Sequence, residues 1–371
     1  MSENLNNTEV RWNYGIDLLR IVCMVMIPTH HVLLHGGILQ NAEWFHPQYK
    51  AAWFLEISVL CAVNVYGIIS GYVGYGRAHR LSRFIKMYIQ LIFYTLLTTA
   101  VFAILRPKLV TGEVVRNAIF PFGYEVYWYC TAYFCLFFFM PVLDRMMERL
   151  DRAEARRLLI ISFILFSVMQ TVYHKQFAHT NEGYSFLWLA LMYIVGAYIR
   201  KYDVGKNGGV VRYLLIYILS VMFVWLSKTG IEHFQYIKTH NYIESIRLVN
   251  YTSPFIIICA VCLVLAFKNL KIGSVAKKAI IFFSPVAFDV YLFHDEPLFR
   301  ENIITGAFTA YLSFNSARML GAVIGTAGII WICGSLVGRL RICFFKLLKV
   351  DNLSIWAEKK VIVMARKLLK I

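Results

Sequence analysis

Long apolar segments recur along the whole chain and are separated by short polar connections. A helix needs about 20 mostly apolar residues to cross the hydrocarbon core of a bilayer, so we interpret each long segment as a membrane span. The pattern predicts about ten spans, at residues 15–35, 51–75, 87–105, 126–143, 158–173, 185–199, 213–228, 251–268, 279–294 and 319–337. We therefore expect an all-α, polytopic membrane protein.

The distribution of basic residues agrees with this number of spans. The connections after the second, fourth, sixth and eighth spans hold 17 Lys and Arg residues, whereas the five alternate connections hold 9. Positively charged loops stay on the cytoplasmic side of a membrane, so we expect these four connections and both termini to be cytoplasmic. The first ten residues are polar and acidic, and the first span lacks a small-residue cleavage site, so no cleavable signal peptide is expected.

The composition excludes an ordinary soluble domain, because 59% of the 371 residues are hydrophobic and only 16% are charged. The net charge of +17 follows from the basic loops and tail, which would contact the lipid bilayer, and it requires no nucleic acid partner. Nearly all of the 8 cysteines lie within apolar segments, where they are expected to be small buried hydrophobes. Cys259 and Cys262 form a CxxC pair without a second pair, so we expect no metal site.

The chain divides into a membrane domain at residues 1–337 and a basic tail at residues 338–371. The tail alternates aromatic, aliphatic and basic residues, which is typical of an amphipathic helix on the cytoplasmic membrane surface. Residues 229–250 are polar and aromatic, as expected of a solvated loop or of a surface that meets a hydrated ligand. Residues 295–315 are amphipathic and are expected to lie along the interface or to re-enter the membrane.

The first span carries Asp17, Arg20, His30 and His31, although charged or titratable groups are costly inside a membrane. At 100° per residue, Asp17, Arg20 and His31 lie within roughly 60° of one another on the helix. Arg20 and His31 are about 16 Å apart along the axis. One alternative is that Arg20 extends to the headgroups and that the histidines cap the other end. The shared face instead favours a functional site.

Four stretches of this sequence resemble the acyltransferase 3 family of bacterial membrane O-acyltransferases: RWNYGIDLLRIVCMVMIPTHH, IISGYVGYGRAHRLSRFIKMYIQLIFYTLL, YWYCTAYFCLFFFMPVLDRMM and FDVYLFHDEP. The resemblance covers most of the chain. Its most specific element is an arginine and a histidine separated by ten residues in the first helix, which Arg20 and His31 match. The resemblance implies a ten-helix fold in the bacterial cytoplasmic membrane and no bound cofactor. It also implies transfer of an acyl group, usually acetyl from acetyl-CoA, to a hydroxyl of an extracytoplasmic glycan.

One position departs from the family pattern. At the third helix the family has a basic residue, a Phe four residues later and an Arg four residues after that. Arg80 and Phe84 match, but Tyr88 stands where the last arginine would be. The neighbouring cations Arg83 and Lys86 could substitute for it.

The implied reaction gives roles to three residues of the first span, the expected catalytic set of His31, Arg20 and Asp17. Transfer to a sugar hydroxyl needs a base, and an imidazole has an unperturbed pKa near 6.5, so His31 suits this task. Arg20 is always charged and suits the phosphates or pantetheine end of coenzyme A. Asp17 lies three residues before Arg20 and would hold its guanidinium.

Five residues at the inner end of the second span and in the connection after it are expected to bind coenzyme A together with Arg20: Ser70, Tyr72, Arg77, Arg80 and Arg83. The alternative is that the basic residues among them only determine topology.

Two regions are candidates for the acceptor site. Trp128 and Tyr129 begin the fourth span and would form either an aromatic belt or a platform for sugar stacking. His294 ends the ninth span and Glu296 follows it, and they would either face the acceptor or cap the helix at the interface.

Three other polar residues within the spans have structural interpretations. Glu56 and Asn64 in the second span are expected to hydrogen-bond, with the first span as a possible partner. His30 lies about 100° from His31 and is expected to pack against a neighbouring helix.

Three functions compete at this point. A membrane O-acyltransferase follows from the resemblance, with acyl-CoA and a glycan as its partners. A secondary transporter is the second, since charges inside a membrane also mark transport paths, although no internal repeat is visible. A flippase for an envelope glycan is the third.

Overall fold

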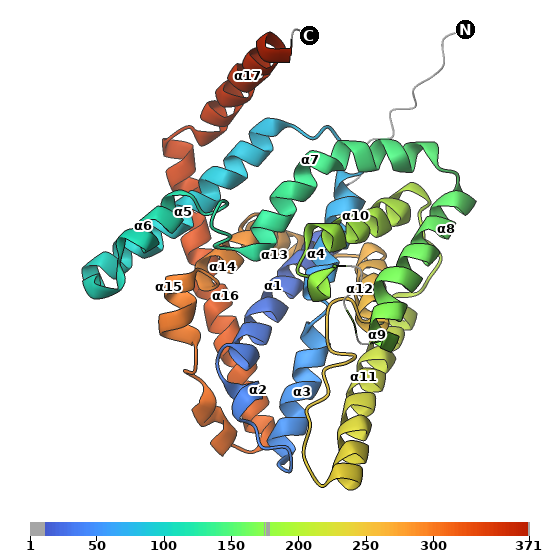
Figure 1. Ribbon diagram of the computed structural model, residues 1–371. Coiled ribbons are helices and arrows are strands. Elements are labelled where there is room, and N and C mark those ends of the chain that lie inside the picture. Colours follow the sequence, from blue (N-terminus) through green and yellow to red (C-terminus); the bar gives the residue numbers. More distant parts are fainter. Residues whose placement is uncertain (1–11, 174, 176–178, 370–371) are drawn as a thin grey trace.

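The computed structural model describes residues 12–173, 175 and 179–369, and this part of the chain is helical and contains no strand (Figure 1). Residues 1–11, expected to be cytoplasmic, lie outside the described residues. The α-helices are α1 (Tyr14–Leu34), α2 (Ile38–Asn41), α3 (Pro47–Val59), α4 (Ala62–Gly74), α5 (Leu81–Leu105), α6 (Gly112–Ile119), α7 (Trp128–Arg149), α8 (Arg152–Phe163), α9 (Met169–Tyr173), α10 (Phe186–Lys201), α11 (Val210–Thr239), α12 (Pro254–Lys268), α13 (Ser274–Phe283), α14 (Ala287–His294), α15 (Pro297–Phe299), α16 (Ser316–Leu347) and α17 (Val350–Leu369). Shorter 3₁₀ turns span Pro107–Leu109, Asn181–Gly183, Ser284–Val286 and Thr309–Ser313, and π turns span Ile164–Val168 and Arg300–Ile304.

Each of the ten predicted segments is helical, and the protein is an all-α polytopic membrane protein, as predicted. Within the described residues, 7 helical stretches are long and apolar enough to cross a membrane: Tyr14–Asn41, Pro47–Gly74, Leu81–Leu105, Trp128–Arg149, Arg152–Tyr173, Val210–Thr239 and Ser316–Leu347. The other three predicted segments form shorter helices, namely α10, α12, and α13 together with α14.

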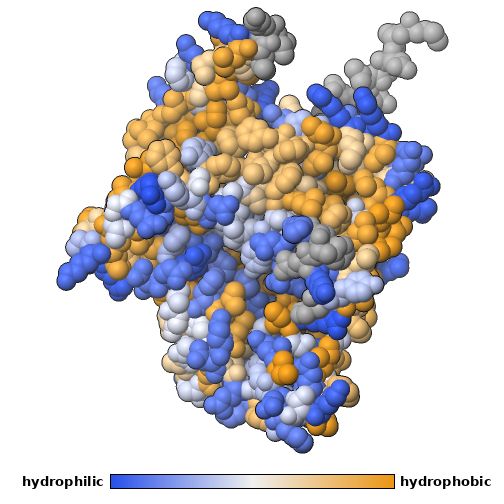
Figure 2. All heavy atoms as spheres, viewed as in Figure 1, coloured by the Kyte–Doolittle hydropathy of each residue, from blue (hydrophilic) through white to orange (hydrophobic). Residues whose placement is uncertain are grey.

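The upper and lower parts of the molecule differ in the hydropathy of the residues on their surface (Figure 2). In Figure 1, α17 and the connection between α4 and α5 lie at the top, and α2 and the end of α11 lie at the bottom. We call these ends the α17 side and the α2 side. On the face shown in Figure 2, apolar residues cover most of the upper part and polar residues most of the lower part. Four of the helical stretches reach the α2 side and have 28 to 32 residues, more than the about 20 that a span requires. They therefore extend beyond the apolar part, and they are Tyr14–Asn41, Pro47–Gly74, Val210–Thr239 and Ser316–Leu347.

The prediction of a loop at residues 229–250 is wrong for residues 229–239, because α11 continues to Thr239. A buried ion pair explains the continuation. Nζ of Lys228 lies 2.5 Å from Oε1 of Glu232 one turn later, and Tyr49 on α3 donates a hydrogen bond to the same oxygen at 2.9 Å. The helix ends where His240 adopts a positive φ of 53°.

The last long helix also runs further than the apolar pattern indicated. The predicted boundary between membrane domain and tail, after residue 337, lies inside α16, which continues to Leu347. The chain turns at Lys349, which has a φ of 49°, and then forms α17. Lys86 on α5 forms an ion pair with Asp351 of α17, so the tail helix is attached to the membrane domain.

Helix α1 is the centre of the fold, because it packs against α3, α4, α12, α14 and α16. Asn13 caps its first turn and also donates a hydrogen bond to the carbonyl of Lys268 at the end of α12 (3.0 Å). Gly15 permits this approach, since a Cβ there would lie 1.9 Å from the carbonyl oxygen of Phe267. The start of α1 is therefore fixed against α12.

Candidate functional site

His31 on α1 and His294 at the end of α14 are in direct contact. Nε2 of His294 lies 3.0 Å from Nδ1 of His31, and Nδ1 of His294 lies 2.6 Å from the carbonyl oxygen of Val290 one turn earlier. The exposed fractions are 8% for His31 and 0% for His294. Two histidines that lie 263 residues apart in the sequence thus form one buried pair.

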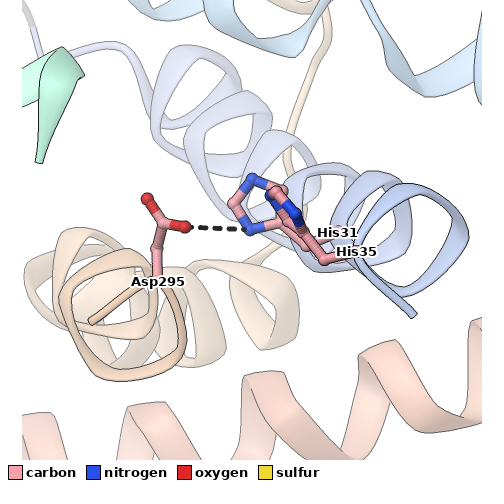
Figure 3. Close-up of side chains that lie close together, drawn as sticks. All are labelled: His31, His35 and Asp295. Carbon is pink, nitrogen blue, oxygen red and sulfur yellow. Dashed lines mark ion pairs between the residues drawn. The ribbon is translucent and has the colours of Figure 1, made fainter. Parts of the chain in front are cut away.

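Asp295 and His35 complete a cluster around His31 (Figure 3). Oδ1 of Asp295 lies 3.6 Å from Nδ1 of His31 and accepts a hydrogen bond from Arg300 at 3.0 Å. His35 lies one turn after His31, with the ring centroids 5.0 Å apart. Ligand atoms of His31, His35 and Asp295 all lie within 4.8 Å of one another, so these three side chains could hold a metal ion. The sequence expectation of no metal stays a prediction.

His30 faces a different partner. Its Nδ1 lies 2.6 Å from Oε1 of Glu56 on α3, and both side chains are mostly buried. The expected contact between Glu56 and the first span is therefore present. Asn64, in contrast, has its partners elsewhere, because it donates to the carbonyl of Tyr251 and accepts from Nε1 of Trp188, each at 2.8 Å.

An apolar chamber lies beside His30 and His31. Its walls come from α1, α3, α4, α7, α14 and the segment before α12, and include His30, His31, Tyr66, Trp128, Tyr129, Tyr251 and Tyr291. Trp128 and Tyr129 were candidates for an aromatic belt or a sugar platform, and the structure places them in the wall of this chamber. Tyr66 also donates a hydrogen bond to the carbonyl of Arg20 at 2.8 Å, which links the chamber to the first half of α1.

Arg20 lies nearer the α17 side than His31 does, in a polar and basic environment. Its Nη1 donates a hydrogen bond to Oδ1 of Asp17 at 2.6 Å, which is the contact expected from their spacing. Arg20 lines a hollow of about 710 Å³ together with Ser70, Arg77 and Arg83.

A second hollow of about 450 Å³ shares Arg20 and Arg77 with the first and adds Tyr72 and Arg200. The Arg200 guanidinium lies over the Tyr72 ring, 5.5 Å from its centroid.

Some predicted residues are not part of this arrangement. Arg80 is the N-cap residue of α5 and lines neither hollow. Tyr88 packs on Phe134, with ring centroids 5.9 Å apart, and Lys86 pairs with Asp351, so of the two substitute cations only Arg83 reaches the hollow.

Glu296 lines a separate cavity, formed by α5, α6 and the segment around α15. There it caps α15 by accepting a hydrogen bond from the amide of Phe299. Burial raises the pKa of its carboxyl to about 7, while hydrogen bonds from the Phe299 and Leu298 amides and the charge of Arg300 act in the opposite direction.

Three charged or titratable residues of the site were not identified from the sequence. Asp144 on α7 lies 2.9 Å from Nε2 of His79 and accepts a hydrogen bond from Tyr193, beside the hollow around Arg20. Asp144 lies among basic residues of the chain, so no sequence pattern distinguishes it. Arg200 is one of the basic residues of the connection after the sixth span, and in the sequence it indicates only topology. His35 follows His31 by four residues, which was a usable signal, since such residues share a helix face.

The arrangement has two chemically different ends on one helix. One end offers several guanidinium groups in two hollows that share Arg20 and Arg77, as a polyanionic ligand requires. The other end offers a buried imidazole at the wall of an apolar chamber. A group that is charged at one end and reactive at the other could therefore be bound along α1.

The family model described as "Acyltransferase domain" matches residues 13–338 of the chain. The match includes the histidine cluster, the chamber and both basic hollows except Trp12, which lines the second hollow. No curated protein and no solved structure matches the chain.

Proposed function

The chain belongs to the acyltransferase 3 family and is an acyltransferase, and from this premise we propose that it is an O-acetyltransferase of the bacterial cytoplasmic membrane. The proposed donor is cytoplasmic acetyl-CoA or another acyl-CoA. The proposed acceptor is a hydroxyl of an extracytoplasmic or lipid-linked polysaccharide.

One observation supports this proposal above the others. Arg20 and His31 lie on the same helix, Arg20 in a basic hollow and His31 in the wall of an apolar chamber. Eleven residues of helix separate them by about 16 Å, which suits a donor whose phosphates and thioester are far apart. Arg20, Arg77 and Arg83 would bind the phosphates through charge-assisted hydrogen bonds, and the chamber would take the pantetheine arm and acyl group.

The proposed reaction is a direct transfer. The imidazole of His31 takes the proton of the acceptor hydroxyl as its oxygen forms a bond to the thioester carbonyl carbon. The carbon–sulfur bond then breaks, and the sulfur leaves with the bonding electrons and takes the proton from the imidazolium. The products are the O-acyl glycan and coenzyme A as its free thiol, and His31 returns to its neutral form.

The proposal also explains why the reactive histidine is buried. A thioester in an apolar chamber is protected from water, which would otherwise compete with the acceptor hydroxyl. Trp128 and Tyr129 lie at the same chamber, so they would contact the acyl group or the sugar ring that receives it.

Vesicles of both orientations test the proposal. Acetyl-CoA labelled in the acetyl group is added to inside-out and right-side-out vesicles that contain the protein and envelope glycan, and alkali-labile label on the glycan is counted. We expect transfer only when the donor reaches the cytoplasmic face, and almost none with His31→Ala. Movement of glycan across the membrane without labelling would instead support a flippase and overturn the proposal.

A further inference from the structure

We propose that His294 is a positioning residue that holds His31 in the one tautomer able to act as a base toward the chamber. This inference rests on the proposed function, because it takes His31 as the proton acceptor. His294 would touch neither the donor nor the acceptor and would act through the ring of His31.

The first step of the argument is the proton on His294. Its Nδ1 lies 2.6 Å from the carbonyl oxygen of Val290, and a carbonyl oxygen can only accept a hydrogen bond. Nδ1 of His294 must therefore carry the proton. The His294 ring is 0% exposed. Gly334 of α16 packs closely against Val290, because a Cβ added at Gly334 would lie 2.8 Å from the Val290 Cα.

The second step is the proton on His31. In a neutral imidazole, one nitrogen donates and the other accepts, so Nε2 of His294 presents a lone pair. That atom lies 3.0 Å from Nδ1 of His31, and two lone pairs would repel at this distance. His31 must then carry its proton on Nδ1 and donate it to His294.

The consequence concerns the other nitrogen of His31. With Nδ1 protonated, Nε2 holds the lone pair, and no hydrogen bond within the described part of the chain engages it. His31 lines the apolar chamber, so this lone pair is the group able to take a proton there. The opposite tautomer would leave Nε2 protonated and unable to act as a base.

Asp295 is the obvious competitor for this role, since a carboxylate commonly orients a catalytic imidazole. Its Oδ1 lies 3.6 Å from Nδ1 of His31, which is longer than a hydrogen bond, and it is engaged by Arg300 at 3.0 Å. The geometry therefore assigns orientation of the ring to His294, and Asp295 would stabilise only the charge of the imidazolium.

Substitutions that replace individual nitrogen atoms of His294 test the inference. The side-chain amide of Gln reaches the position of Nε2 and can accept from His31, whereas that of Asn reaches only the position of Nδ1. Because a general base contributes about 10²–10⁴-fold, we expect His294→Asn and His294→Ala to lower kcat by about 100-fold with unchanged KM for the donor, and His294→Gln to retain activity within about 10-fold. Equal losses for Gln and Asn would overturn the inference.

A second readout does not depend on activity. Nitrogen-15 NMR of histidine-labelled protein in bilayers distinguishes Nδ1–H from Nε2–H rings, and the His31 signal is identified by its loss in His31→Gln. We expect an Nδ1–H ring that shifts toward the other tautomer in His294→Ala, and no change in the exposed control His46→Asn. An Nε2–H ring in the unaltered protein would overturn the inference.

Two further outcomes would also count against it. The unaltered protein is assayed for bound metal, and a stoichiometric ion lost in both His31→Ala and His294→Ala would make the pair metal ligands. A loss of 100-fold or more in Asp295→Asn together with full activity in His294→Ala would give the role to Asp295. Absence of acyl transfer in the unaltered protein would refute the proposed function instead, and the NMR result would remain interpretable.

Discussion

Arg341 on α16 holds Asp289 on α14 through two hydrogen bonds, from Nε to Oδ1 at 2.9 Å and from Nη2 to Oδ2 at 2.6 Å. Tyr94 and Gln90 of α5 donate to the same carboxylate at 2.9 and 2.8 Å. Asp289 is 0% and Arg341 5% exposed. The ion pair therefore fixes α14, which ends at His294, between α5 and α16.

This ion pair leads to a prediction about stability. Removing one partner of a buried pair costs about 3–5 kcal/mol, because the other charge stays buried without compensation. We expect Arg341→Ala to lower the melting temperature in detergent strongly. The double variant Asp289→Asn with Arg341→Met should be more stable than Arg341→Ala, because it buries no unpaired charge. Equal melting temperatures for the two would contradict this explanation.

His31 and His30 should have separable effects. His31→Ala removes the proposed base and should lower kcat by about 10²–10⁴-fold with a normal amount of protein in the membrane. His30→Ala should reduce kcat much less but destabilise the fold, because it leaves the buried carboxyl of Glu56 without its partner. Acyl transfer and melting temperature are measured on both variants, and the reverse ranking in kcat would identify His30 as the base.

Arg20 should affect the donor more than the acceptor. We expect Arg20→Ala to raise the KM for acyl-CoA, and Arg20→Lys to be nearly as poor, since a point charge cannot reproduce a bidentate contact. Asp17→Asn should also raise the KM for acyl-CoA, but by a smaller factor, because the carboxylate only orients the guanidinium. Steady-state kinetics with either substrate varied provides the test, and an unchanged donor KM in Arg20→Ala would refute the assignment.

The expected topology can be tested at three exposed positions. Single cysteines in place of Gln40, Val115 and His240 should react with a membrane-impermeant maleimide from outside intact cells, since we expect these connections to be extracytoplasmic. A cysteine in place of Lys206, in a basic connection, is the control and should react only after lysis. If the first three cysteines react only after lysis, the orientation is the opposite of the one expected, and the donor site lies on the outside.

Glu296 should make stability depend on pH. Its folded pKa of about 7 lies above the ordinary value of 4.5, so the folded state binds the proton more tightly than the unfolded state. The stability contribution is fully present below pH 4.5 and is lost as the pH rises through 7. Glu296→Gln should therefore raise the melting temperature at pH 8 relative to the unaltered protein and change it little at pH 4.5. An equal shift in melting temperature at both pH values would show that protonation of Glu296 is not the cause.

The sequence by itself determined the class of the molecule and identified the candidate site residues of its first helix. The spans follow from the length of the apolar segments, because a bilayer requires about 20 such residues whatever their neighbours are. The contact between Asp17 and Arg20 follows from helix geometry alone, since residues three apart share a face. These features are local, and so a single segment was enough to predict them.

Only the tertiary structure decided which distant residues meet. His31 and His294 lie 263 positions apart, and their contact depends on how α14 packs against α1, which no local pattern encodes. The same is true of the Asp289–Arg341 pair and of Glu296, which the structure places in a separate cavity. Polar contacts inside the protein depend on the packing of several helices at once, and their sequence signal is a buried polar residue without an identified partner.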